Sequence, residues 1–441
     1  MKKRHICLLN DSFPPQIDGV ANTVVNYAAE LTKRGNDAFV VTPEYPGADD
    51  SAFAFPVIRY PGLDMRSSVG YIAGIPFSPH VVNVAKERKT QILHSHCPVA
   101  STMLARNLKE TLDVPLVMTY HTKFDIDIEK AVKGKLLQEG AINALVNNVS
   151  LCDEVWVVSE GAGENLRSLG YQGDYIVMEN GVDVPKKRLT KERSLELTAD
   201  YVFPENVPVF LFVGRLMWYK GLRIIIDALA ALRSQGIDFR MVFVGNGTDR
   251  EEVEAYVKSL GLDDRIFFTG AIYDREVLCA WYCRSDLFLF PSTFDTNGLV
   301  VREAAACSLA SVLIKGSCAA EGVTDRQNGF FIEENAASLA VLLAMISNDR
   351  RMLRRVGQAA ADELYISWSD SVATAAKRYG MVIENYKKGV YRQPFSPSEE
   401  LFRFSGELMD LFAEAQKKRL ESDARLAAFR TRIADSLDRY L

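Results

Sequence analysis

Short apolar runs alternate with longer segments of helical period along most of the chain. In the first half, the apolar runs occupy residues 6–9, 38–42, 57–60, 92–94, 116–120, 154–158 and 175–178. Between several of them lie segments such as residues 22–33, where Val24, Val25, Ala28 and Leu31 share one helical face. Buried strands separated by helices are typical of a parallel sheet with helices on both sides.

The pattern stops at a polar segment, about residues 184–208, and then starts again. The second set of apolar runs occupies residues 209–213, 241–244, 266–269, 287–290, 311–314 and 329–332. Because 441 residues are too many for one ordinary core, we predict two doubly wound α/β domains, residues 1–185 and 186–368. Two such domains leave a cleft facing the carboxyl ends of both sheets, where ligands of this architecture bind.

The last part of the chain has a different pattern. We predict a helix over residues 369–394 and then a helical extension over residues 395–441, which contain no strand-like run. Apolar residues recur in the extension at helical spacing, and basic residues occupy its middle. We interpret it as helices that pack on the body or on another subunit, which would form a homo-oligomer. A helix for a membrane surface or a partner is the alternative.

Composition narrows the class of protein. The net charge of -5 argues against nucleic acid as the main partner, because a phosphate backbone selects a basic surface. No apolar stretch approaches the roughly 20 residues of a membrane span, so we expect a cytoplasmic protein, with peripheral contact to the inner membrane face left open. Among seven cysteines, only Cys279 and Cys283 are close in sequence, and we interpret this pair as core packing rather than a zinc site.

One candidate site follows the apolar run at residues 287–290. Asp295 and Glu303 flank a turn at which Gly298 and Leu299 begin a predicted helix. Amides at a helix start can hold a phosphate, and carboxylates can bind the hydroxyls of a sugar or a ribose. A helix cap and a solvated carboxylate are the structural alternative for these two acids.

A second candidate is the glycine-flanked loop after the run at residues 209–213. It carries Arg215 and Lys220 between Gly214 and Gly221. A diphosphate leaving group requires a cationic clamp of this kind, above all where no metal is present. Taken alone, the loop would be interpreted as a surface turn that carries an arginine and a lysine.

Residues of the first half could complete the site. Gly19 follows the first strand and opens a helix, and His121 ends the strand at residues 116–120. We interpret His94 and His96 as structural. The Asp125-Ile126-Asp127 sequence resembles the two-aspartate signature of a class of metal-dependent enzymes, and we interpret it as chance.

Taken in order, these elements resemble glycosyltransferase family 4, over about residues 5–385. Further matching segments are Val158-Ser159-Glu160, Asn180-Gly181-Val182-Asp183, Val244-Gly245-Asn246-Gly247 and Phe268-Thr269-Gly270. The resemblance implies the GT-B fold, two facing Rossmann-like domains, with a late helix that crosses back to the first domain. It also implies transfer with retention of configuration, without a metal or cofactor.

The resemblance assigns roles to the candidate residues. Arg215 and Lys220 would stabilise the departing diphosphate, and Glu303 would bind the ribose. Asp295 would hold the donor sugar, and Gly19 and His121 would approach the transferred sugar and its phosphate. This sequence departs from the family pattern at three positions. Asp295 stands where the family usually carries Glu, and the first loop has one glycine where two are common. Asn297 is polar at a position where many members carry Phe, and in this respect the sequence is similar to the family's diacylglycerol glucosyltransferases.

The resemblance therefore implies a hexosyltransferase that uses a nucleotide diphosphate sugar, with UDP the commoner nucleotide and GDP the alternative. A segment with Lys130, Lys133 and Lys135 beside Leu136 and Leu137 suggests contact with anionic lipid and favours a lipid acceptor such as diacylglycerol. The alternatives are a soluble sugar or polysaccharide acceptor, a sugar-nucleotide epimerase or phosphorylase of the same shape, and a non-catalytic two-domain binding protein.

Overall fold

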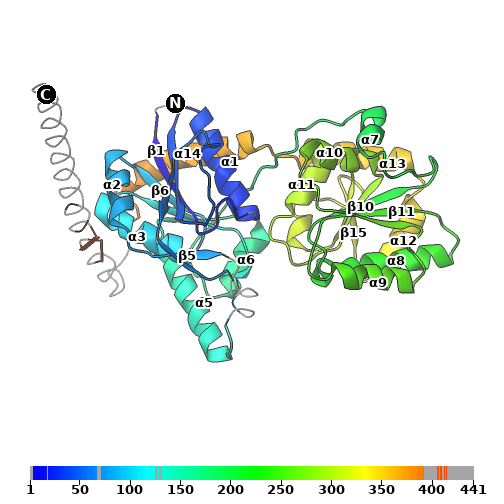
Figure 1. Ribbon diagram of the computed structural model, residues 1–441, viewed down its shortest axis with the longest axis horizontal. Helices are drawn as coiled ribbons and strands as arrows, with labels where there is room; N and C mark the ends of the chain where they lie inside the picture. Colours follow the sequence, from blue (N-terminus) through cyan, green and yellow to red (C-terminus); the bar gives the residue numbers. More distant parts are fainter. Residues whose placement is uncertain are drawn as a thin grey trace, which may run out of the picture. The chain divides into compact units, whose positions relative to one another are not determined.

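The computed structural model describes residues 3–16, 18–66, 71–124, 128, 132–391, 405, 406, 408, 409, 412 and 414 (Figure 1). Its contacts divide the chain into two compact units. The first unit comprises Met1–Val158, Gly163–Met178 and Val372–Leu441, and the second comprises Ser159–Ala162 and Glu179–Ser371. Residues 179–185, which the sequence analysis assigned to the first domain, therefore join the second unit.

The first unit contains a seven-stranded parallel sheet in the order β3-β2-β1-β6-β7-β8-β9. Its strands are β1 (His5–Leu9), β2 (Asp37–Pro43), β3 (Val57–Tyr60), β6 (Ile92–Ser95), β7 (Leu116–Tyr120), β8 (Glu154–Val157) and β9 (Ile176–Val177). The helices are α1 (Gly19–Lys33), α2 (Pro79–Glu87), α3 (Ala100–Leu112), α5 (Lys135–Ser150) and α6 (Glu160–Ser168), and β4 (Gly62–Asp64) pairs with β5 (Ile72–Gly74). The strand order reverses beside β1, which places the ends of β1 and β6 at a topological switch point.

The second unit contains a six-stranded parallel sheet in the order β12-β11-β10-β13-β14-β15. Its strands are β10 (Val209–Val213), β11 (Arg240–Val244), β12 (Ile266–Gly270), β13 (Leu287–Phe290), β14 (Ser311–Ile314) and β15 (Phe330–Ile332). Figure 1 shows α8 (Leu222–Ser234), α9 (Arg250–Ser259) and α12 (Ala336–Ile346) on one face of this sheet. The other face carries α7 (Lys191–Leu197), α10 (Arg275–Arg284), α11 (Leu299–Ala306) and α13 (Arg350–Glu363). Two doubly wound parallel sheets confirm the predicted fold class.

The central strands are apolar throughout because helices cover both of their sides. All five residues of β10 are buried, and so are all four of β13. Phe212 of β10 stacks on Phe290 of β13, with ring centroids 5.8 Å apart. Burial of each such side chain contributes about 1.5–3 kcal/mol, so this core holds the loops at the strand ends in place.

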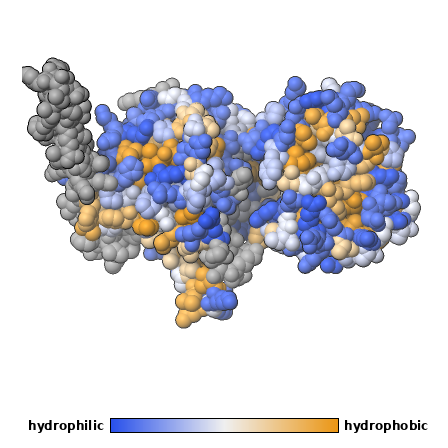
Figure 2. Space-filling view, in the orientation of Figure 1, coloured by the Kyte–Doolittle hydropathy of each residue, from blue (hydrophilic) through white to orange (hydrophobic). Residues whose placement is uncertain are grey.

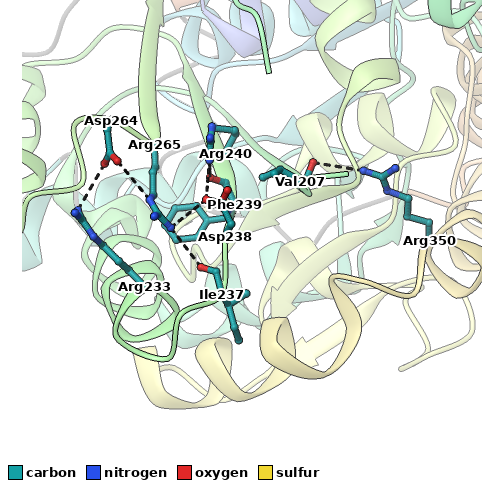
Figure 3. Close-up of polar contacts among 9 residues, drawn as sticks. All are labelled: Val207, Arg233, Ile237, Asp238, Phe239, Arg240, Asp264, Arg265 and Arg350. Carbon is teal, nitrogen blue, oxygen red and sulfur yellow. Dashed lines mark hydrogen bonds and ion pairs between the residues drawn. The ribbon is translucent and has the colours of Figure 1, made fainter. Parts of the chain in front are cut away.

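A network of arginine and aspartate side chains lies at the amino ends of β11 and β12 (Figure 3). Asp238 pairs with Arg240 at 2.8 Å and with Arg265 at 3.0 Å, and Asp264 pairs with Arg233 at 3.6 Å. These groups are partly exposed to water, where an ion pair contributes only about 0–1 kcal/mol. We refer to them as the amino-end network.

The helix α14 (Trp368–Lys387) follows α13 and belongs to both units. Its residues up to Ser371 belong to the second unit, and those from Val372 belong to the first. Tyr379 stacks on Trp156 of β8, with ring centroids 5.4 Å apart, and Arg378 pairs with Glu154 at 2.7 Å. These contacts attach the second part of α14 to the first sheet.

Most of the predicted extension, residues 395–441, lies outside the described residues. Of those described, Met409 is buried, and its Sδ accepts a hydrogen bond from the Ser78 amide at 3.3 Å. The role of the extension in a homo-oligomer stays a prediction. Among the residues that the structure describes, none of the helices combines the length and apolarity that a membrane crossing requires.

Candidate functional site

Lys220 and Asp295 meet at the carboxyl edge of the second sheet. Lys220 ends the short 3₁₀ helix η1 (Trp218–Lys220) after β10, and Asp295 lies in the loop after β13. The Lys220 ammonium is 2.7 Å from Oδ1 of Asp295, and the Ser292 hydroxyl donates to Oδ2 at 2.6 Å. Only 7% of Lys220 is exposed, so this charge is held in one place rather than solvated.

The loop that carries Lys220 is held by the neighbouring loop after β11. The Leu216 amide donates to the Asn246 carbonyl at 3.0 Å, and the Trp218 amide donates to Asp249 at 2.8 Å. Gly221 has a φ of +77°, and a Cβ there would lie 2.0 Å from the Pro291 carbonyl oxygen. Only glycine therefore lets the chain turn directly from Lys220 into α8.

Arg215, the second predicted cation, lies in the same loop but in a different environment. Its side chain is exposed, and within the described part of the chain no hydrogen bond or ion pair engages its guanidinium. A guanidinium can donate two parallel hydrogen bonds to a phosphate. The two cations thus differ, since Lys220 is paired and buried whereas Arg215 reaches solvent.

The helix α11 begins at Gly298, as predicted. Gly298 has left-handed backbone, with φ +59° and ψ +46°, and a Cβ there would lie 2.9 Å from the Cβ of Ala319. Gly298 is the N-cap residue of α11, and it has no side chain that could accept a hydrogen bond from the first amides of the helix, such as that of Leu299. A helix start of this kind attracts an anion.

Glu303 lies one turn into α11 and is held by two side chains of α10. Tyr282 donates its hydroxyl hydrogen to Oε2 at 3.0 Å, and the Arg275 guanidinium is 3.4 Å from Oε1. Arg275 also pairs with Asp183 at 3.0 Å. Burial raises the pKa of the Glu303 carboxyl, while Arg275 and Tyr282 act against that rise.

Sequence reasoning did not find Arg275, Tyr282 or Asp183 as members of this group. Asp183 belongs to the Asn180–Asp183 segment that contributed to the family resemblance, so a signal existed for it. Arg275 and Tyr282 lie in a short helix whose residues from Leu278 to Cys283 are all buried, and nothing in their spacing distinguishes them from surface or core residues.

In the first unit, His121 lies at the carboxyl end of β7 and contacts a second histidine. Nε2 of His121 is 2.9 Å from Nδ1 of His96, and the two rings stack with centroids 5.2 Å apart. Burial lowers the pKa of His121 to about 3, so the imidazole is neutral at physiological pH. In a hydrogen bond between two imidazoles, the ring that accepts must be neutral, because both nitrogens of a protonated ring are donors.

His94 lies deeper in the same sheet, with both ring nitrogens engaged. Nδ1 is 2.6 Å from the Tyr379 hydroxyl, and Nε2 is 2.7 Å from the Thr119 hydroxyl. Burial lowers the pKa of both His94 and His96 well below the usual value. His96 therefore contacts His121 from the core side, and His94 packs against His96.

Gly19 is the first residue of α1 and is exposed, and no atom of the described residues lies within 4 Å of the position that a Cβ would take. The open space allows close approach of a ligand. The following amides of Val20 and Ala21, however, donate to the Asp18 carboxylate at 2.9 and 2.8 Å. This helix start is thus capped by the chain itself, unlike that of α11. Asp125, Ile126 and Asp127 lie outside the described residues.

Two family models match the chain, one on each half. "Glycosyltransferase Family 4" matches residues 17–186, and "Glycosyl transferases group 1" matches residues 195–363. The chain belongs to glycosyltransferase family 4. The two matched segments fall on the two parallel sheets, and the structure of this glycosyltransferase has the GT-B fold.

The curated relatives include a glycolipid synthase and a mannosyltransferase. This glycosyltransferase is 25% identical to alpha-monoglucosyldiacylglycerol synthase of Acholeplasma laidlawii over 355 residues, covering 78% of this chain and 88% of the relative. It is 24% identical to a GDP-mannose-dependent alpha-mannosyltransferase of Corynebacterium glutamicum, covering 76% and 78%. Among solved structures, Anabaena HepE in complex with UDP matches with a TM-score of 0.68 and 20% identity, over 86% of this chain and all of the other.

Proposed function

We propose that this glycosyltransferase transfers a hexose from a UDP-sugar, with retention of configuration, to the hydroxyl of a membrane lipid such as diacylglycerol. The observation that carries the proposal is the arrangement at the carboxyl edge of the second sheet. Lys220 with Asp295, the glycine start of α11, and Glu303 all belong to loops or helices that begin at this edge. Cations, an open helix start and carboxylates are what a nucleoside diphosphate sugar requires.

In the proposed donor complex, Lys220 and Arg215 bind the diphosphate. Their charge takes the part that a divalent metal plays in other transferases, so the reaction needs no metal ion. Amides at the start of α11 bind the same group, Glu303 accepts hydrogen bonds from the ribose, and Asp295 accepts from the sugar. UDP is favoured over GDP because HepE, one of the structural neighbours, is described in complex with UDP and glucose.

The proposed reaction breaks the bond between the sugar anomeric carbon and the diphosphate oxygen. A new bond forms between the same carbon and the acceptor oxygen on the same face of the sugar. The acceptor proton passes to the departing diphosphate, whose developing charge is stabilised by Lys220 and Arg215. His121, which is neutral, orients the sugar by a hydrogen bond rather than by charge.

The helix α5 supports the choice of a lipid acceptor. Leu136 is 82% exposed and Leu137 is 65% exposed, in the first turn of α5, with Lys133 and Lys135 exposed beside them. Figure 2 shows an apolar patch over this helix. Exposed leucines flanked by lysines suit the surface of an anionic bilayer. Two relatives are named as alpha-monoglucosyldiacylglycerol synthases, from Acholeplasma laidlawii and Streptococcus pneumoniae.

The test is a transfer assay with the full chain. Radiolabelled UDP-glucose or GDP-mannose is mixed with vesicles of diacylglycerol and anionic lipid, with and without a metal chelator. We expect labelled glycolipid from UDP-glucose alone, unaffected by the chelator, with an α linkage by proton NMR. Leu136→Ser/Leu137→Ser should lose vesicle binding and glycolipid synthesis while still binding UDP.

The alternatives give different results in the same assay. Product with GDP-mannose alone would replace the proposed donor, and an inverted linkage would contradict retention. Product with soluble sugars and not with vesicles would remove the lipid acceptor. Conversion of the sugar nucleotide without any acceptor would indicate an epimerase, and UDP binding without turnover would indicate a binding protein.

A further inference from the structure

Three cysteines come together in the second unit. Cys279 and Cys283 lie one helical turn apart on α10, and Cys307 directly follows α11. Sγ of Cys279 is 3.9 Å from Sγ of Cys283 and 3.3 Å from Sγ of Cys307, and all three sulfurs lie within 4.8 Å of one another. Each residue is at most 5% exposed. The sequence pointed only to the pair on α10, because Cys307 is 24 positions beyond Cys283 along the chain.

We propose that Cys279, Cys283 and Cys307 form a binding site for a thiophilic metal ion, with Zn²⁺ as the physiological candidate. Zinc binds thiolates at about 2.3 Å, so two thiolates in a tetrahedral zinc site lie about 3.8 Å apart. The observed separations of 3.9 and 3.3 Å bracket this value. Soft sulfur ligands select zinc or Cu(I) over magnesium and calcium.

A backbone amide and a guanidinium lie beside the sulfurs. The Leu189 amide donates to Sγ of Cys283 at 3.3 Å, as amides do around metal-bound thiolates. The Arg188 guanidinium donates to the carbonyls of Cys283 at 2.6 Å and of Cys307 at 3.3 Å. Three thiolates and one Zn²⁺ leave one net negative charge, which Arg188 offsets.

A metal ion could reach this site from a cavity on the surface of the second unit. The cavity has a volume of about 900 Å³, and Arg188, Leu189, Cys283, Ser308 and Leu309 contribute to its wall. Structural zinc is almost always four-coordinate. A water or small ligand from the cavity would supply the fourth position, on the side of Cys283.

The proposed metal would link two helices that carry the donor-binding group. Arg275 and Tyr282 of α10 contact Glu303 of α11, and the three sulfurs join the same two helices. A bound ion would therefore stabilise the second unit and hold Glu303 in position. The proposal concerns a structural site, and the transfer reaction does not pass through the metal.

The experiment measures zinc binding by the full, reduced chain without an affinity tag. Purified protein is freed of metal and titrated with Zn²⁺ against a chromophoric chelator. We expect about one tightly bound Zn²⁺ per chain and a raised thermal unfolding midpoint. Cys307→Ser and Cys279→Ser should each lose this binding, whereas Cys152→Ser, a buried cysteine of the first unit, should keep it. Circular dichroism reports that each variant is folded.

X-ray absorption of the zinc-loaded wild type tests the site without a substitution. Three sulfur neighbours at about 2.3 Å would support the proposal. Zinc with only nitrogen and oxygen neighbours would overturn it. Equal zinc binding by wild type and by a Cys279→Ser/Cys307→Ser variant would also overturn it and would leave the thiols as packing groups.

Discussion

The carboxyl edges of the two sheets carry different chemistry. In the first unit, burial raises the pKa of Asp11 and lowers that of His94, His96 and His121, so the three histidines are neutral. In the second unit, the same edge carries charge, with Lys220 paired to Asp295. Both sheets follow the same topology, so the difference arises from the loops rather than from the fold.

This difference is what a two-substrate transfer requires. A diphosphate carries charge, and only charged groups or a helix start repay its loss of water. A sugar or a lipid hydroxyl is neutral, so neutral hydrogen-bonding groups such as His121 are sufficient to position it. We therefore propose that the second unit binds the donor nucleotide, with Asp295 accepting a hydrogen bond from the sugar, and that neutral groups of the first unit orient the sugar and the acceptor hydroxyl. The predictions below test this assignment, beginning with the largest effect.

The first prediction removes the buried cation of the second unit. Lys220→Ala should lower kcat about 10³-fold, because one preorganised group that stabilises developing charge contributes about that factor. Transfer from UDP-glucose measures the effect. Arg240→Ala, which removes a cation of the amino-end network, should change the rate less than twofold. A Lys220→Ala enzyme within tenfold of wild type would mean that the diphosphate is bound elsewhere.

The second prediction removes the neutral donor of the first unit. His121→Ala should lower kcat about 10²-fold, the contribution expected from one positioned hydrogen-bonding group, and leave the Kd for UDP unchanged. Isothermal titration of UDP and steady-state kinetics separate the two quantities. Because the pKa of His121 is about 3, its titration should contribute no limb to the rate profile above pH 5. Weaker UDP binding in this variant would break the assignment of the nucleotide to the second unit.

The third prediction concerns the carboxylate that is proposed to bind the ribose. Glu303→Gln should weaken UDP binding about tenfold, since an amide keeps one acceptor but loses the charge. Burial raises the pKa of Glu303, so wild-type affinity should fall on acidification at a higher pH than for an ordinary glutamate, and the variant should show no such fall.

Acidification should have opposite effects on nucleotide binding and on folding stability through the raised pKa of Glu303. A carboxyl whose pKa is higher in the folded state than in the unfolded state binds its proton more readily when folded. Lowering the pH through the folded pKa therefore removes a destabilising charge. Nucleotide binding by the wild type should thus weaken in a pH range where Glu303 itself stabilises the fold. A loss of binding that coincides with unfolding would contradict this account.

The sequence was sufficient for the parts of the site that depend on local order. The strands, the start of α11 at Gly298 and the positions of Lys220 and Glu303 follow from apolar runs and from loops at strand ends. Contacts between residues that are far apart in the sequence do not follow from these patterns. Lys220 and Asp295 are 75 positions apart, and Arg275 and Asp183 are 92 apart, so loop conformation and rotamers decide whether they meet.

The histidines show the same limit in the first unit. His96 and His121 end neighbouring strands, and this much could be inferred from the alternation of strands and helices. Their direct contact, and the burial that keeps both neutral, depend on side-chain packing, such as that of Tyr27 against His96. A pattern of polar and apolar positions does not specify such packing.

The smallest effect is expected at the opposite edge of the second sheet. Asp238→Asn removes the carboxylate that pairs with Arg240 and Arg265 in the amino-end network (Figure 3). Since exposed pairs contribute about 0–1 kcal/mol, the free energy of unfolding should fall by less than about 1 kcal/mol, and transfer should stay within twofold of wild type. Urea denaturation and the transfer assay measure the two. If Asp238→Asn reduced transfer as strongly as Lys220→Ala, charge at either end of the sheet would serve the reaction. The contrast between a charged donor edge and a neutral acceptor edge would then no longer explain how this glycosyltransferase binds its two substrates.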